Sequence, residues 1–200
     1  VGSSITSEIK IGKQYDLRNV EETNKMFNDY KPTHVIHCAG KVGGLSANMN
    51  YKGEFFYDNI MINTNVIESS RLHNVKKLVS FLSTCVFPDN IEYPITEKKI
   101  HLGEPHSSNY PYAYAKRMAD IKIRAYREQY GLEYVSVIPT NIYGPNDNFS
   151  LESGHVIPML LHKMYIAQRE NTDFVVWGSG TPLREFIYSD TAIRLQIDNT

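Results

Sequence analysis

Tyr112 and Lys116 are the residues whose types and spacing point most directly to chemistry. They are four residues apart in a stretch rich in Ala, Lys, Arg and Met, which favours a helix. On a helix this spacing places both side chains on one face, with Cβ atoms about 5–6 Å apart. A neighbouring ammonium favours the phenolate, so we expect Lys116 to lower the pKa of Tyr112 from about 10. Such a pair could protonate a carbonyl that is being reduced; the alternative is a surface helix with an ordinary Tyr and Lys.

Three further candidates follow predicted strands. Ser83 comes directly after the apolar run 78–82, so its hydroxyl either holds a substrate carbonyl beside Tyr112 or merely closes the strand. Cys85 is either a reactive thiol at this strand end or a small buried residue. Gly40 follows the run 33–39 and permits either close approach of a ligand or a turn.

Charged and aromatic residues later in the chain suggest a binding site. The planar guanidinium of Arg184 could bind a diphosphate through paired hydrogen bonds. The Trp177 ring could either stack on a base or pack in the core. Lys163 is by default a solvated charge on a helix. His34 and His37 resemble a metal-binding pair, but their odd spacing on a strand points them to opposite faces, so we expect no metal.

Apolar runs alternate with helical periodicity along the chain. The pattern predicts strands at 33–39, 78–82, 134–138 and 174–177, with 183–188 as a further candidate, and helices at 19–30, 53–74, 112–130 and 155–168. We expect the first strand to be buried on both faces, with Cys38 in the core. This alternation predicts an α/β fold with a doubly wound parallel sheet, and ligands bind such sheets beyond the carboxyl ends of the strands. The long connection 86–109 is of a length that is usually functional.

Composition narrows the class of protein. The 200 residues suit one ordinary domain, with 42% hydrophobic and 22% charged residues and a net charge of −1. This balance argues against nucleic-acid and membrane partners, and no apolar run approaches the roughly 18 residues of a membrane span. Two cysteines form no disulfide framework and no signal peptide opens the chain, so we expect a cytoplasmic protein.

Several longer motifs resemble the GDP-L-fucose synthase family of extended short-chain dehydrogenases/reductases. They are Ser83-Thr-Cys85, Tyr112-Ala-Tyr-Ala-Lys116, Pro139-Thr-Asn-Ile-Tyr-Gly-Pro-Asn-Asp-Asn-Phe149, Gly154-His-Val-Ile-Pro158 and Val176-Trp-Gly-Ser-Gly-Thr-Pro-Leu-Arg-Glu-Phe186. The segment from His37 to Gly44 also looks like the corresponding part of that family. The resemblance extends from about residue 16 to residue 188.

The resemblance implies an NADPH-dependent epimerase/reductase, an oxidoreductase and isomerase acting on GDP-4-keto-6-deoxymannose. By analogy, Cys85 and His155 invert carbons 3 and 5, and Ser83 and Tyr112 stabilise charge on the ketone oxygen. Tyr112 then protonates the reduced ketone while Lys116 holds the nicotinamide ribose. The implied NADP(H)-binding residues are Phe81, Leu82, Ser83, Thr84, Lys116, Pro139, Thr140, Asn141, Ile142 and His155. The residues implied to hold the GDP portion are Lys163, Trp177 and Arg184.

The sequence also departs from the family pattern. The family opens with a strand and a Gly-rich turn for the pyrophosphate, which this chain lacks, and continues beyond the position of Thr200. We therefore expect residues 1–150 to form a Rossmann-like NADP-binding domain without its Gly-rich loop, and residues 151–200 a partial substrate-binding domain. The family resemblance suggests a homodimer. Two alternatives remain open: an inactive binding or regulatory relative, and another nucleotide-sugar epimerase or dehydratase.

Overall fold

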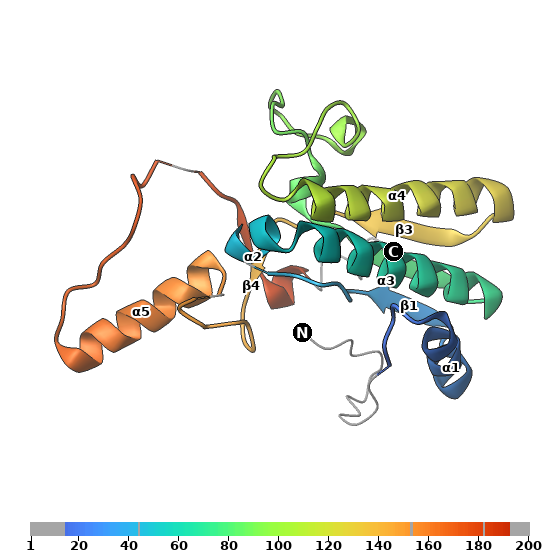
Figure 1. Cartoon of the computed structure of the whole chain (residues 1–200), viewed down its shortest axis with the longest axis horizontal. Coiled ribbons are helices and arrows are strands. Elements are labelled where there is room, and N and C mark those ends of the chain that lie inside the picture. Colours follow the sequence, from blue (N-terminus) through green and yellow to red (C-terminus); the bar gives the residue numbers. More distant parts are fainter. Residues whose placement is uncertain (1–14, 44, 153, 182, 193–200) are drawn as a thin grey trace. The chain divides into compact units, whose positions relative to one another are not determined.

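The computed structural model describes residues 15–43, 45–152, 154–181 and 183–192 (Figure 1). The chain divides into two compact units, Val1–Ile138 and Pro139–Thr200. The functional division predicted at residues 150 and 151 stays a prediction, and its outermost segments, 1–14 and 193–200, lie outside the described residues.

The first unit contains a parallel three-stranded sheet. Its strands are β1 (His34–His37), β2 (Lys77–Phe81) and β3 (Glu133–Val137), in the order β1-β2-β3. Val35, Leu78 and Tyr134 lie side by side across the three strands. The predicted α/β fold with a parallel sheet is therefore confirmed, and so are three of the predicted strands.

Helices connect these strands. The described helices of this unit are α1 (Val20–Tyr30), α2 (Leu45–Asn50), α3 (Lys52–Leu72) and α4 (Tyr110–Tyr130), with short 3₁₀ turns η1 (Thr84–Val86) and η2 (Glu97–Lys99). The α3 and α4 helices lie side by side along their length (Figure 1). The sequence predicts α1, α3 and α4 closely but not α2. None of the helices in the described ranges is both long and apolar enough to cross a bilayer.

One hydrophobic core joins these helices to the sheet. Buried side chains that share it include Phe27, Val35, Val66, Ile67, Leu78, Ile123 and Tyr134. Ile36 lies on the alternate face of β1 and is 61% exposed, so the expectation that this strand is buried on both faces is wrong. Cys38 follows the strand rather than lying within it and is exposed, so its predicted place in the core is also wrong.

The second unit has a smaller framework. Strand β4 (Asn141–Tyr143) pairs in parallel with β5 (Phe186–Tyr188), and helix α5 (Val156–Glu170) lies between them in the sequence. Residues 183–188 thus contain a strand as predicted, whereas 174–177 do not. Phe174, Val175 and Val176 are each at least 43% exposed and have no strand partner among the described residues.

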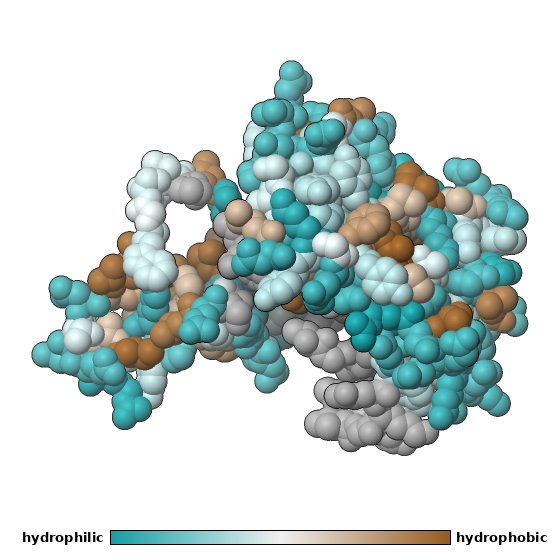
Figure 2. Space-filling view, viewed as in Figure 1, coloured by the Kyte–Doolittle hydropathy of each residue, from teal (hydrophilic) through white to brown (hydrophobic). Residues whose placement is uncertain are grey.

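Helix α5 carries several exposed apolar side chains. Val156, Leu161 and Met164 are between 45% and 55% exposed, and brown side chains are visible along this helix in Figure 2. Of its described residues, Pro158 and Ala167 are buried. Burial within the second unit therefore gives α5 little hydrophobic stabilisation.

Gly131 ends helix α4 in the left-handed conformation, with a φ of 66° and a hydrogen bond from its N–H to the Arg127 carbonyl. We predict that Gly131→Ala lowers the free energy of unfolding by about 1 kcal/mol, because a Cβ disfavours this conformation. No atom lies within 4 Å of the added Cβ, so the cost is conformational. Urea unfolding measures it.

Gly53→Ala is the matched control, because Gly53 has equally open surroundings and helical backbone inside α3. Alanine should leave stability unchanged or raise it there. A Gly131→Ala protein as stable as the control would contradict the prediction.

Candidate active site

Helix α4 places the Lys116 ammonium at the carboxyl ends of the first two strands. Its Nζ donates a hydrogen bond to the Phe81 carbonyl at 3.0 Å, and the side chain is almost fully buried. A Cβ on Gly40, just beyond β1, would lie 3.6 Å from this Nζ. Burial lowers the pKa of Lys116 to about 8, although negative charge at Cys85 and Cys38 would raise it.

Tyr112 lies one turn before Lys116 on the same face of α4, as the spacing predicts. The Lys116 Nζ is 5.8 Å from the centre of the Tyr112 ring. The predicted lowering of its pKa is wrong: burial raises the pKa of Tyr112, and negative charge at Cys85 raises it further. Desolvation of the phenolate therefore outweighs the nearby ammonium, and Tyr112 is protonated at neutral pH, the form needed in a proton donor.

Ser83 and Cys85 lie on the turn that follows β2. The extended backbone of Ser83 leads into η1, and this places the half-buried Cys85 near α4. Burial raises the pKa of Cys85, whereas a hydrogen bond from Ser83 and the positive charge of Lys116 lower it. Since Tyr112 also responds to the charge at Cys85, the four predicted residues of this unit form one interacting group.

A buried pair formed by a histidine and an asparagine supports this group, and no sequence pattern predicts its role. The His37 ring donates from Nε2 to Asn63 Oδ1 at 2.9 Å, because Asn63 Nδ2 itself donates to the Ala115 carbonyl. Burial, together with the positive charge of Lys116, lowers the pKa of His37 to about 4, although the hydrogen bond with Asn63 opposes the shift. His34 is exposed, so the two histidines occupy opposite faces of β1 as expected.

Asn59 braces the loop after β1. Its Oδ1 accepts from the Lys41 N–H at 3.0 Å, and its Nδ2 donates to the carbonyls of Lys41 and Phe55. A Cβ on Gly40 would approach Asn59 Oδ1 to 3.0 Å. A Cβ at this position would therefore crowd the Asn59 side chain, and glycine allows the loop to approach α3 and Lys116 closely. Two asparagines one turn apart beside apolar residues in a predicted helix, Asn59 and Asn63, are the sequence signal that could have revealed this network.

The second unit holds the remaining predicted residues. His155 precedes α5 with its side chain 67% exposed, and its Nδ1 lies 4.0 Å from Asp147 Oδ1. The Lys163 Nζ lies 3.6 Å from the centre of the Trp177 ring, which is 77% exposed and so does not pack in the core. Arg184 is exposed and donates to the Leu183 carbonyl.

The predicted cofactor segment at the start of this unit contains β4. The Asn141 side chain donates to the Glu185 carbonyl at 2.9 Å and so ties β4 to the residue before β5. The predicted roles of Pro139, Thr140, Asn141 and Ile142 in cofactor binding stay predictions. The same holds for the joint action of His155 with Cys85.

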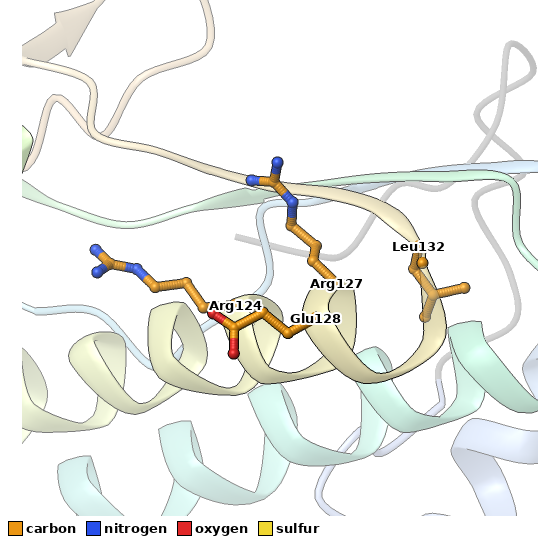
Figure 3. A pocket seen from close by; sticks show the side chains of 5 residues that line it. Arg124, Arg127, Glu128 and Leu132 are labelled. Atoms are coloured by element: carbon orange, nitrogen blue, oxygen red, sulfur yellow. The ribbon is translucent and has the colours of Figure 1, made fainter.

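A surface hollow at the opposite end of α4 is separate from this group. Arg124, Arg127, Glu128, Gly131 and Leu132 line it, and Figure 3 shows the two arginine side chains extending from the same helix. It begins 12 residues after Tyr112, or about 18 Å along the helix. Neither a predicted catalytic residue nor a predicted binding residue lines it.

The chain belongs to the NAD dependent epimerase/dehydratase family, whose sequence profile matches residues 4–197. A GDP-L-fucose synthase of Dictyostelium discoideum is 58% identical over 174 residues, which are 87% of this chain and 54% of that protein. A crystal structure of a GDP-L-fucose synthetase from Naegleria fowleri bound to NADP is 53% identical, with a TM-score of 0.85 over 91% of this chain and 60% of that one.

A GDP-mannoheptose C4 reductase from Campylobacter jejuni with NADP bound is 30% identical, with a TM-score of 0.82 over 92% of this chain and 64% of that one. The chain thus spans between one half and two thirds of the length of these relatives. The fold predicted from the sequence and its resemblance to GDP-L-fucose synthases are both confirmed.

The buried His37 should make the stability of the protein depend on pH. Its pKa is about 4 in the folded chain, against the ordinary histidine value of 6.5 once the chain unfolds, so below pH 6.5 the unfolded chain binds a proton that the folded chain excludes. Stability therefore falls as pH falls from 6.5 towards 4. The parent protein should lose free energy of unfolding between pH 7 and pH 5. We predict that His37→Gln makes this loss smaller by about 2 kcal/mol, as measured by urea unfolding at both pH values.

His34→Gln is the control for this measurement, because His34 is the exposed histidine of the same strand. It should leave the acid-induced loss of stability unchanged. Equal effects of the two substitutions would show that the burial of His37 is not the cause.

Proposed function

We propose that this chain carries the catalytic centre of an NADPH-dependent enzyme that converts GDP-4-keto-6-deoxymannose to GDP-L-fucose, by 3,5-epimerisation and then 4-keto reduction. The observation that carries the proposal is the group of Ser83, Cys85, Tyr112 and Lys116 on β2, η1 and α4. The 58% identity with a GDP-L-fucose synthase supports the choice of substrate.

One ketone explains why a single site serves both reactions. The protons on carbons 3 and 5 of the sugar are acidic because the carbon 4 ketone stabilises the enolate formed when either is removed. The Ser83 hydroxyl and the Tyr112 phenol are the donors for the negative charge that develops on the ketone oxygen. Because the pKa of Tyr112 is raised, this residue keeps its proton until the reduction step.

Epimerisation needs a base on one face of the sugar and an acid on the other. Cys85 is the proposed group of the first unit: burial raises the pKa of its thiol, and the hydrogen bond from Ser83 and the positive charge of Lys116 oppose that rise. His155 is its proposed counterpart. Removal of a proton by one group and delivery of a proton by the other inverts the carbon, with no net change in charge.

The residues at the strand ends fit a nicotinamide cofactor. Gly40 leaves space beside Lys116, whose ammonium uses one N–H for Phe81 and has two more for the hydroxyls of a ribose. NADPH, when bound, supplies the hydride for the ketone. Lys116 then orients the ribose, and Tyr112 delivers its proton to the ketone oxygen.

The GDP portion is assigned to the second unit. Lys163 and Trp177 already lie in contact, and the Trp177 ring is exposed and so can stack on a base. The exposed guanidinium of Arg184 suits a diphosphate. We propose the cytoplasm as the compartment, because both cysteines are free thiols. The homodimer stays a prediction from the family resemblance.

Calorimetric titration with NADPH, followed by product analysis with GDP-4-keto-6-deoxymannose, tests the proposed function. We expect saturable binding and formation of GDP-L-fucose. Absence of binding at millimolar NADPH would instead support an inactive relative with a binding role. A different sugar product would support another epimerase or dehydratase activity.

The two half-reactions should be separable by substitution. Tyr112→Phe removes the proton donor, so we predict at least a 100-fold loss of reduction while solvent deuterium still enters carbons 3 and 5. Cys85→Ser replaces the thiol by a far weaker acid and should block this exchange. NMR of the sugar measures both reactions.

Each of these variants is the control for the other, since both proteins should bind NADPH as the parent does. Full turnover by either variant would refute the role assigned to its residue.

A further inference from the structure

Arg117 is a buried cation that the proposed reaction does not use. It directly follows Lys116 on α4 and is 5% exposed. Its Nε donates to the Val86 carbonyl at 2.7 Å, and its Nη1 donates to the Gly103 carbonyl at 2.8 Å. Arg117 therefore joins α4 to both ends of the segment that runs from η1 into the long connection.

The hydrogen bonds of this guanidinium are incomplete. Within the described ranges, no ion pair joins Arg117 to a carboxylate, and its buried Nη2 has no hydrogen-bond partner. A buried charge and an unpaired donor are both costly. The structure thus places a positive group with unused N–H bonds beside the turn that carries Cys85.

Cys85 and Arg117 act on each other electrostatically. Burial raises the pKa of Cys85, and the charge of Arg117 is one of the smaller effects that oppose this rise; burial lowers the pKa of Arg117, and negative charge at Tyr114 and at Cys85 opposes that lowering. The carbonyl that Arg117 holds belongs to Val86, the next residue of the same 3₁₀ turn. The described groups that act on the thiol are Lys116 and Arg117 from α4 and Ser83 from its own segment, and negative charge at the thiol in turn acts on Tyr112 of α4.

We propose that Arg117 is a positioning residue that holds the η1 turn against α4 and stabilises the thiolate form of Cys85. The inference rests on the proposed function in taking Cys85 as a proton-transfer group. Two consecutive residues of α4 then hold the two sides of the turn. Lys116 donates to the Phe81 carbonyl before the turn, and Arg117 donates to the Val86 carbonyl at its end. A merely structural role for Arg117 would secure the turn without changing the acidity of the thiol.

The pH dependence of iodoacetamide alkylation distinguishes these roles. It reports the thiolate fraction at each cysteine, is read by mass spectrometry of the two peptides, and needs neither substrate nor cofactor. We expect Arg117→Gln to raise the midpoint for Cys85 by about one pH unit, because the charge is lost. Arg117→Lys keeps the charge but cannot donate to both carbonyls, so it should raise the midpoint by less than half as much.

Cys38 is an internal control in the same protein, because Lys116 acts on its thiol and Arg117 does not. Its midpoint should stay within about 0.2 pH units in both variants. Arg124→Gln is a control for loss of a cation from the same helix, since Arg124 is half exposed and pairs with Asp120. It should leave Cys85 unchanged.

The proposal is overturned if Cys85 does not shift in Arg117→Gln, if Cys38 or the Arg124 control shifts equally, or if the Gln and Lys variants shift alike. Circular dichroism establishes that each variant is folded. Should Arg117→Gln fail to fold, Arg117→Lys decides: a rise of the Cys85 midpoint by more than about 0.2 and less than about 0.5 pH units supports the proposal, and no rise or a larger rise overturns it.

A different measurement, the formation of GDP-L-fucose, tests the proposed function. Absence of GDP-L-fucose formation from a protein whose Cys85 midpoint depends on Arg117 would refute the reaction and leave the Arg117–Cys85 coupling established. Normal turnover with no dependence of the Cys85 midpoint on Arg117 would refute the coupling alone.

Discussion

The bond between the Lys116 ammonium and the Phe81 carbonyl is the interaction on which the site depends. A cation buried at the end of a parallel sheet must be held by dipoles and nearby groups, because water no longer solvates it. That single bond brings α4 to the end of β2, and so places Tyr112 and the Cys85 turn beside the same charge. The raised pKa of Tyr112 and the lowered pKa of His37 both follow from the burial that this arrangement creates.

Sequence patterns predict the first unit well because its elements depend on local signals. The apolar run at residues 78–82 predicts a strand, and a helical pattern that ends at a glycine predicts the helix that ends at Gly131. Both elements occur as expected. The shared face of Tyr112 and Lys116 follows from helix geometry alone. Their pKa values do not, because the balance of desolvation and Coulomb attraction is set by burial, which spacing does not specify.

Features that depend on distant partners were not predicted. No strand is predicted at residues 141–143, yet β4 forms there because Phe186–Tyr188 pairs with it, whereas Phe174–Trp177 has a strand pattern and finds no described partner. The links from His37 to Asn63 and from Arg117 to Val86 join residues 26 and 31 positions apart. Local sequence patterns do not predict such contacts. Polar residues on the face of a helix that is expected to pack against the core are a partial signal that a buried polar contact exists.

Trp177 is the sole tryptophan of the chain, and it lies exposed beneath the Lys163 ammonium. Intrinsic fluorescence excited in the indole band therefore originates from one indole in the second unit, with a cation 3.6 Å from its ring centre acting on its excited state. Anything that displaces that ammonium or covers the indole changes the emission without a label. The protein thus contains its own optical probe for events at this one position.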